Sequence, residues 1–270
     1  MSLELDGATV VRGGRTTLRE VSFAARAGEV LAIVGPNGAG KTTALGVVSG
    51  ALKPNEGRVL LDGRPLEEFR PDLLAQRRAV VPQSAQVAFP FRVHEVVAFG
   101  RAPHRGRSSA AQDAEIVDQA LVRFDLLAFA DRDVTTLSGG ERQRVHLARA
   151  FAQVWTTPED AGDRWLLLDE PTAALDPTHQ IAALSAAGQF AGAGGGAIIV
   201  LHDLRLAAAY ADRVVVLQSG QLVTIGVPAE VLTSSRICDV FALVESQAHL
   251  FIDEARASCG RRTVASARTA

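Results

Sequence analysis

The chain has 270 residues, enough for one large domain or two small ones around a sizeable core. Its formal net charge of −2 argues against a protein that binds nucleic acid in bulk, because such proteins are usually basic. Two cysteines, Cys238 and Cys259, are too few for a disulfide framework and too far apart for a metal knuckle, which favours a reduced, cytoplasmic setting.

The opening of the chain predicts β-structure. Residues 1–6 carry neither the basic nor the apolar region of a secretion signal, and charged residues interrupt the longest apolar runs, so no segment is expected to span a membrane. Short alternating runs within residues 1–34, separated by glycine-containing turns, predict an antiparallel hairpin region that leads into a buried strand at 30–34. Membrane association is therefore expected to come only through a partner.

A phosphate-binding loop is predicted directly after that strand. Residues 35–43 read Gly-Pro-Asn-Gly-Ala-Gly-Lys-Thr-Thr, and a short helix is expected over residues 44–50. Glycines let successive backbone N–H groups curl round a phosphate, and the helix N-terminus adds a partial positive charge. The alternative is a glycine-rich turn followed by chance by Lys-Thr, and the flanking strand and helix argue against it.

The loop predicts a nucleoside triphosphate as the bound molecule. Lys41 would reach its β- and γ-phosphates, and the hydroxyl of Thr42 would bind Mg²⁺. The predicted phosphate-binding residues are Gly35, Pro36, Asn37, Gly38, Ala39, Gly40, Lys41, Thr42 and Thr43.

The rest of the pattern predicts an α/β fold. Strands are expected at residues 58–61 and just before Gln83, and from about residue 91 to residue 152 apolar residues recur at helical spacing. Apolar strands then resume at residues 165–168, 197–201 and 213–217. We therefore expect a mostly parallel sheet, an N-terminal antiparallel β region and an inserted helical subdomain, with a weakly ordered tail at the end.

A second phosphate-directed helix is predicted at residues 137–141, Leu-Ser-Gly-Gly-Glu. Ser138 and Glu141 have the spacing of a capping box, which marks a helix start with free N–H groups. Gly139 and Gly140 would let a phosphate come close to the backbone. Taken alone, the motif fits a well-capped helix without a ligand equally well.

Two acids follow the apolar strand at 165–168. Buried strands seldom carry adjacent carboxylates such as Asp169 and Glu170 unless compensating charge lies nearby, and a cation–phosphate site supplies it. Asp169 would hold Mg²⁺ through water, and Glu170 would polarise the attacking water. His202 ends the next strand, where ligands gather in open α/β sheets, so a role at the site is favoured over a purely structural one.

Together these residues resemble the ATP-binding subunits of ABC transporters, over roughly residues 1–245. The motifs that occur in that family's order are the loop at 35–43, Gln83, residues 137–141, Asp169 with Glu170, Ala-Leu-Asp at 174–176, and His202. The resemblance implies a P-loop NTPase fold of the ABC type. Its ATP-binding domain would span residues 1–255, with a RecA-like core of about 1–83 and 156–245, a helical subdomain of about 84–155, and a flexible tail at 256–270.

The resemblance also implies a dimer with shared sites. Two copies would face each other head to tail, each ATP lying between the Lys41 loop of one chain and the Ser138 turn of the other. Hydrolysis requires donors around the transferred phosphoryl group, and a capped helix from a second subunit would complete that shell only when ATP bridges the two. One loop and one signature per chain give a closed two-fold dimer two equivalent sites.

Particular roles follow from the same resemblance. Glu170 activates water, His202 contacts the γ-phosphate, and both act with Lys41 in catalysis. Gln83 senses Mg²⁺, and Asp176 communicates across the dimer. The implied nucleotide contacts outside the loop are Gln83, Ser138, Gly139, Gly140, Glu141, Asp176 and His202, and the implied metal-binding residues are Thr42, Gln83 and Asp169.

One feature of the family is missing. An aromatic residue usually stacks on adenine near the start of the domain, yet residues 9–15 contain none. Arg12 could lie flat over the base by guanidinium stacking. The equal alternative is that Val11 and its neighbours hold adenine only loosely.

Finer features resemble importers of iron chelates and cobalamin, and most closely the haem importer ATPases. They are the Phe-Pro-Phe run at 89–91, the Gly-Arg-Ala-Pro run at 100–103, the polar insertion from Gln153 to Arg164, and residues 176–180. These are subgroup habits and contain no haem chemistry. No haem ligand is expected on the chain, and His94, His104 and His249 are interpreted as surface histidines.

The resemblance implies partners in a membrane complex. Residues 84–107 should dock two transmembrane permease subunits, since they follow Gln83 and carry Arg92, Arg101, Arg105 and Arg107; a solvated basic loop is the alternative. An extracytoplasmic binding protein would act indirectly, and no nucleic acid is expected. The chain would lie peripherally on the cytoplasmic face of the bacterial inner membrane.

Three other classes fit the sequence less well. Soluble ABC ATPases of DNA repair or translation usually carry a long coiled-coil insertion or two cassettes, and this chain has neither. A phosphate-loop kinase or small GTPase would leave Ser138, Gly139, Gly140 and His202 without a role. Exporter cassettes are commonly fused to their membrane domain. Within the importers, a ferric siderophore or cobalamin remains the alternative cargo to haem.

Overall fold

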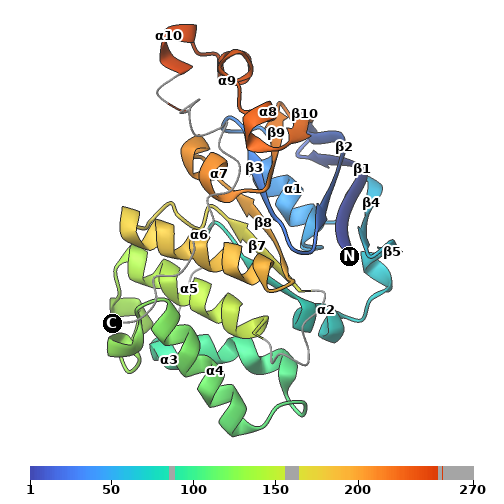
Figure 1. Ribbon diagram of the computed structural model, residues 1–270. Helices are drawn as coiled ribbons and strands as arrows, with labels where there is room; N and C mark the ends of the chain where they lie inside the picture. Colours follow the sequence, from blue (N-terminus) through green and yellow to red (C-terminus); the bar gives the residue numbers. More distant parts are fainter. Residues whose placement is uncertain (85–88, 156–163, 249–250, 252–270) are drawn as a thin grey trace.

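The structure is a computed structural model that describes residues 1–84, 89–155, 164–248 and 251. A four-stranded antiparallel sheet stands at the N-terminal side (Figure 1). Its strand order is β2-β1-β4-β5, formed by β1 (Ser2–Arg12), β2 (Arg15–Arg26), β4 (Glu56–Leu61) and β5 (Arg64–Pro65).

A six-stranded sheet forms the centre of the molecule. Its order is β10-β9-β3-β8-β7-β6, and all neighbours pair in parallel except the hairpin of β9 and β10. The strands are β3 (Val30–Val34), β6 (Arg78–Val81), β7 (Trp165–Asp169), β8 (Gly196–Val200), β9 (Arg213–Gln218) and β10 (Gln221–Gly226).

The central strands are apolar throughout because both faces of the sheet are covered. Every residue of β3, β7 and β8 is buried. Alternate residues serve two cores: Ala32 and Leu168 face the one packed under the helices, whereas Ile33 and Leu167 face the one shared with β1, β2 and α1 (Lys41–Val48). The sheet therefore fixes its loops between two packed layers.

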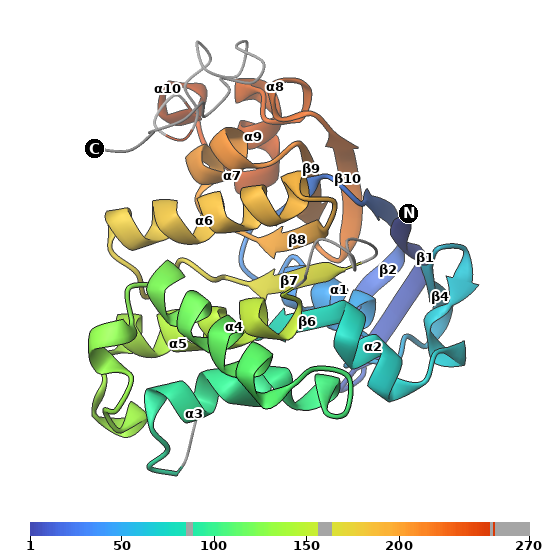
Figure 2. The same cartoon turned by 60° about the horizontal axis from the view of Figure 1, so that its bottom comes forward.

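Between β6 and β7, the described elements are all helical. They are α3 (Val93–Ala98), α4 (Ala110–Arg123), α5 (Gly139–Gln153) and the short 3₁₀ turns η2 (Phe99–His104), η3 (Leu127–Phe129) and η4 (Val134–Thr136). In Figures 1 and 2, α3, α4 and α5 group together, away from β1, β2 and β4. We call this group the helical lobe.

The other helices cover the sheet or follow its last strand. They are η1 (Leu66–Glu68), α2 (Pro71–Arg77), α6 (Pro177–Gly192), α7 (Leu204–Tyr210), α8 (Pro228–Val231), α9 (Ser234–Phe241) and α10 (Glu245–Ala248). Figure 2 shows α6 lying along β7 and β8 above the helical lobe. Among the described residues, no helix has both the length and the apolar character needed to cross a membrane.

The expected fold class is confirmed: an α/β core with a mostly parallel sheet, an N-terminal antiparallel region and an inserted helical region. The helix expected over residues 44–50 begins earlier, at Lys41. Residues 156–163 of the predicted polar insertion, His249 and the predicted tail at 256–270 lie outside the described residues.

Arg101 cannot belong to an exposed docking surface, and His104 is only partly at the surface. Arg101 is only 6% exposed, because its Nε donates to Asp113 Oδ1 at 2.8 Å and its Nη1 donates to the Ala152 carbonyl at 2.7 Å. His104 is half-buried and bonds the Gln153 carbonyl at 2.7 Å. Burial lowers the pKa of His104 despite that bond. Both side chains connect η2 to α5.

Candidate functional site

A cleft opens at the carboxyl edge of the central sheet, where four neighbouring strands β3, β8, β7 and β6 end. Its volume is about 720 Å³, within the range of ligand sites. The lining residues are Thr17, Asn37, Gly38, Ala39, Gly40, Lys41, Thr42, Thr43, Gln83, Glu170 and His202. Residues far apart in the sequence thus meet because parallel strands deliver their following loops to one edge.

The phosphate loop is packed too tightly for side chains at two glycines. A Cβ on Gly35 would lie 2.1 Å from the Leu217 carbonyl oxygen, and one on Gly40 would lie 2.7 Å from both the Thr17 carbonyl oxygen and Leu18 Cδ2. Gly40 also has φ +97°, a conformation that favours glycine. These glycines are therefore required by the backbone's close approach to β9 and β2.

Lys41 is a buried cation at the start of α1. Its side chain is enclosed by the loop, and Nζ donates to the carbonyls of Gly35 at 2.8 Å and Pro36 at 2.9 Å. Burial lowers the pKa of Lys41, against the raising effect of Glu170 and Asp169. A buried ammonium beside a helix N-terminus attracts an anion such as phosphate.

Hard oxygen groups converge beside the loop. The Thr42 hydroxyl donates to Asp169 Oδ1 at 3.3 Å, and Asp169 is buried at the end of β7. Burial raises the pKa of Asp169, with the charge of Glu170 adding to the effect, although the Thr42 hydroxyl and Lys41 act against it. Hydroxyl, carboxylate and the nearby Gln83 amide are the donor types that Mg²⁺ prefers, so the set fits that ion.

Glu170 lies between side chains from two other strands. Gln83, after β6, donates its Nε2 to Glu170 Oε2 at 2.9 Å, and His202, after β8, bonds Oε1 through its Nε2. The Glu170 backbone has φ +50° and its N–H donates to the Val200 carbonyl at 3.2 Å. Gln83 and His202 therefore hold the Glu170 carboxylate at the lining of the cleft.

The predicted signature residues lie elsewhere. Ser138 caps α5 by accepting from the Glu141 N–H at 3.3 Å, and Glu141 Oε2 accepts from the Ser138 N–H at 2.7 Å, so the predicted capping box is confirmed. Bonds from the Ser138 hydroxyl and then the backbone lower the pKa of Glu141. Among the described residues, neither this turn nor Asp176 lines the cleft of its own chain. Ser138, Gly139 and Asp176 are instead exposed.

Arg12, the candidate for stacking on adenine, lies outside the lining of the cleft. Arg12 is exposed at the tip of the β1–β2 hairpin, opposite Arg15, and is not among the residues that line the cleft. Thr17 of β2 lines it instead. Sequence reasoning missed Thr17 because an ordinary β-strand threonine carries no motif. Asp203, next to His202, caps α7 by accepting from the Arg205 N–H at 2.7 Å.

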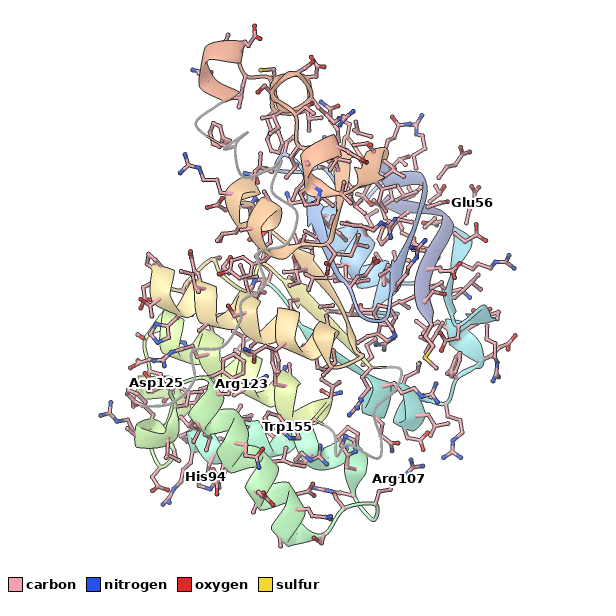
Figure 3. All side chains as sticks on the ribbon, in the orientation of Figure 1. Glu56, His94, Arg107, Arg123, Asp125 and Trp155 are labelled. Atoms are coloured by element: carbon pink, nitrogen blue, oxygen red, sulfur yellow. The ribbon has the colours of Figure 1, made fainter. Side chains whose placement is uncertain are left out.

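A wider hollow of about 900 Å³ lies on the helical lobe. It runs along α4 beside Trp155 and Arg123, both labelled in Figure 3. Glu115 and Asp118 are the acids in its lining, and Arg123 is the base. This hollow lacks the converging cation, oxygen donors and histidine of the smaller cleft. We therefore place the candidate site at the end of the central sheet.

Comparisons with known proteins agree with this geometry. A family model described as "ABC transporter" matches residues 18–173. The hemin import ATP-binding protein HmuV of Myxococcus xanthus is 48% identical over 243 residues, covering 90% of this chain and 91% of that protein. The protein of the same name from Pseudomonas aeruginosa is 48% identical over 241 residues, covering 89% and 92%.

Solved structures are similar as well. An inward-facing putative metal-chelate type ABC transporter aligns with TM-score 0.72 and 27% identity over 90% of this chain and 89% of that one. A dimeric bacterial ABC transporter cassette aligns with TM-score 0.73 and 26% identity over 84% of this chain and 98% of that one. A related dimeric cassette holds ADP and Pi in a post-hydrolysis state.

Proposed function

The chain belongs to the ABC transporter family, and we propose that it is the ATP-binding and hydrolysing subunit of an importer that takes up haem. One observation carries the ATPase part of the proposal. Lys41, the Thr42–Asp169 pair and the Glu170–His202 pair meet at one cleft, although they come from three distant parts of the chain. A purely structural role for each side chain would not require them all to meet in one place.

The proposed roles follow from the contacts. The phosphate loop from Gly35 to Thr43 wraps the triphosphate with backbone N–H groups, and Lys41 pairs with its oxygens. Thr42, Gln83 and Asp169 hold Mg²⁺, which when bound neutralises charge on the phosphates. This requires an ionised Asp169, and the burial that raises its pKa is offset once a cation lies beside it.

Glu170 is proposed to accept a proton from the attacking water. In the structure Gln83 bonds one of its oxygens and His202 bonds the other. Water can reach the carboxylate when either partner turns to the nucleotide. A phosphate oxygen is a suitable acceptor for the His202 N–H, so binding of the triphosphate itself would free Glu170 as a base.

The site requires a second copy of the chain. The helix start at Ser138, Gly139, Gly140 and Glu141 is exposed at its first two residues, and its first N–H groups have no partner within the helix. Since this turn is absent from the lining of its own chain's cleft, we propose that it covers the nucleotide of a partner chain, with Asp176 at the same interface. The dimeric cassettes of similar fold support this arrangement.

The permease is proposed to dock at the start of the helical lobe. Phe89, Phe91 and Phe99 are 68%, 36% and 50% exposed, and their rings contact one another edge to face at centroid distances of 6.3 and 5.1 Å. An exposed aromatic cluster of this kind fits a protein partner. Arg92 and Arg105 of the same segment are exposed, whereas Arg101 is excluded because it is buried.

Further parts of the proposal rest on the family. ATP and Mg²⁺ are the bound species, and the complex contains two permease subunits and an extracytoplasmic binding protein. The chain would lie peripherally on the cytoplasmic face of the inner membrane. We retain the division into a core of about 1–83 and 156–245, a helical subdomain of about 84–155 and a tail at 256–270. Arg12 stacking on adenine stays a hypothesis.

Haem is proposed as cargo because relatives at 48% identity carry the hemin import name over about nine-tenths of the chain. The alternative cargo is a ferric siderophore or cobalamin, which the similarity to a metal-chelate type transporter does not separate from haem. The test is reconstitution with the cognate permease in lipid vesicles. Haem-loaded binding protein should stimulate ATP hydrolysis more than siderophore- or cobalamin-loaded binding proteins, and the reverse order would reject haem.

A further inference from the structure

The turn at residues 171–176, between β7 and α6, is fastened to the start of α5. A Cβ on Gly140 would lie 2.8 Å from the Ala174 carbonyl oxygen, so the two backbones are in direct contact. Gln143 of α5 donates its Nε2 to the Pro171 carbonyl at 3.3 Å. The Ser138 turn and the Asp176 turn are therefore one continuous surface of the molecule.

The Asp176 carboxylate has a separate partner for each oxygen. Oδ1 accepts from the His179 backbone N–H at 3.0 Å, which caps α6, and Oδ2 is bonded by His179 Nδ1 at 2.7 Å. Since a carboxylate only accepts, the proton of this bond lies on Nδ1. These bonds, backbone first, lower the pKa of Asp176, so it is ionised at neutral pH.

The backbone and the side chain of His179 thus have separate effects on Asp176. The cap depends on the backbone of residue 179, which any residue other than proline supplies. The direction of the carboxylate depends on the imidazole of His179. The His179 side chain is 27% exposed, whereas the Asp176 side chain is 59% exposed. Without the ring, the carboxylate keeps its cap but its second oxygen loses its fixed direction.

The far side of the ring faces the helical lobe. His179 Nε2 lies 3.9 Å from Asp125 Oδ2, and Asp125 follows α4 with φ +52°. Arg144, on α5, holds that bend by donating to the carbonyls of Phe124 at 2.9 Å and Asp125 at 2.7 Å. Figure 3 shows Asp125 and Arg123 at the end of α4, on the side of the lobe next to α6. The ring thus lies between the carboxylates of Asp176 and Asp125.

We propose that His179 is a positioning residue for ATP hydrolysis: it aims the Asp176 carboxylate at the partner chain, beside the Ser138 turn. The inference rests on the proposed function, because Asp176 has a role only if two chains share their sites. His179 touches neither nucleotide nor water; it acts through Asp176. Asp125 and Arg144 keep the ring facing that carboxylate.

The test uses the purified full chain with three substitutions at residue 179. His179→Ala removes the bond to Oδ2, His179→Asn places an amide N–H near the position of Nδ1, and His179→Gln places one near Nε2 instead. We expect His179→Ala to lower kcat about tenfold, the effect of losing one hydrogen bond to a charged group. The affinity of a single chain for ATP should stay within about twofold, because the cleft is untouched.

The same substitution should weaken dimer formation. In a Glu170→Gln background with ATP and Mg²⁺, His179→Ala should raise the dimer dissociation constant about tenfold, as measured by analytical ultracentrifugation. His179→Asn should restore most of both losses, and His179→Gln should not. A purely structural histidine would instead show its loss in thermal stability, with kcat following the folded fraction.

Gln189→Ala is the matched control. Gln189 also lies on α6 and also reaches the helical lobe, where its Oε1 accepts from Arg123 Nη2 at 2.8 Å, but it does not touch Asp176. This variant should keep wild-type kcat and dimerisation. Equal losses in Gln189→Ala and His179→Ala would overturn the proposal, since lobe–core contact alone would then explain them.

Two further outcomes would overturn it: wild-type behaviour of His179→Ala, or rescue by His179→Gln and not by His179→Asn. Failure of the shared-site function is recognised separately. In that case the otherwise unsubstituted Glu170→Gln chain would not dimerise with ATP, whatever residue stands at 179.

Discussion

At the scale of single residues, Glu170 and Asp169 are adjacent but differently placed. Asp169 belongs to β7 and is buried against Thr42, whereas Glu170 has left the strand and is held in the cleft by Gln83 and His202. One carboxylate is thus suited to a cation and the other to water. The two carboxylates are placed differently because the backbone turns at Glu170, which has φ +50°.

The raised pKa of Asp169 leads to a prediction on stability. A carboxyl whose folded pKa exceeds its unfolded value favours unfolding when ionised, and this cost disappears as pH falls through the folded pKa. Asp169→Asn should therefore raise the melting temperature of the nucleotide-free chain at neutral pH by about 2–4 °C, the shift of roughly 1 kcal/mol in a domain of this size.

That gain should shrink as the solution is made acidic, and added Mg²⁺ with ATP should reverse the order of the two melting temperatures. Thermal unfolding followed by circular dichroism measures both effects. If Asp169→Asn melts below the wild type at neutral pH without nucleotide, burial of the ionised Asp169 carboxylate does not destabilise the folded chain.

At the scale of elements, the phosphate loop depends on β2 and β9 as much as on α1. Gly40 lies against the Thr17 carbonyl, and Gly220, after β9, donates its N–H to the Ala39 carbonyl at 3.1 Å. The antiparallel region therefore forms one wall of the nucleotide site.

Gly40→Ala tests this wall. Gly63, in the turn after β4, has a similar backbone with φ +75° but open space around it, so Gly63→Ala measures conformational strain alone, about 1 kcal/mol. Gly40→Ala should cost about 3 kcal/mol or more, because the new Cβ also collides with Thr17 and Leu18. Urea denaturation compares the two, and equal costs would show that the contact with β2 yields freely.

Many of the individual strands, loops and helix starts are predictable from the sequence. The apolar run at residues 30–34 followed by a glycine loop, and the capping-box spacing of Ser138 and Glu141, depend on neighbours along the chain. The strand order is not predictable in this way, because it depends on which strands pair across long separations. The contact of Gln83 with Glu170 follows from that pairing. The position of Thr17 depends on how β2 packs against the phosphate loop, and the burial of Arg101 depends on its bonds to Asp113 and Ala152 in the helical lobe.

At the scale of the whole molecule, the proposed dimer gives each chain half of two sites. The Lys41 loop opens on one side of the core, and the Ser138 turn is exposed at the start of α5 without lining that cleft. Association of two copies would bring each turn over the other's nucleotide. ATP would then act as part of the interface, and its hydrolysis would release the dimer.

Ser138→Arg tests the sharing of sites. The bulky cation should leave ATP binding by one chain unchanged, because residue 138 is outside the cleft, but it should obstruct the partner's nucleotide and lower hydrolysis about a hundredfold or more. Fluorescent-nucleotide titration and phosphate release measure the two effects. Ala111→Arg, at an exposed position on α4 away from this turn, adds the same charge and should keep wild-type hydrolysis.

Retained hydrolysis in Ser138→Arg would place the whole reaction within one chain. Loss of nucleotide binding together with hydrolysis would instead mean that the Ser138 turn supports its own cleft.

The most direct measurement is the mass in solution of Glu170→Gln with ATP and Mg²⁺. The amide cannot accept the proton from water, so ATP should remain bound and hold two chains together at twice the 28.5 kDa of one. The same protein without nucleotide should be a monomer. A single-chain mass at full ATP occupancy would contradict the shared site.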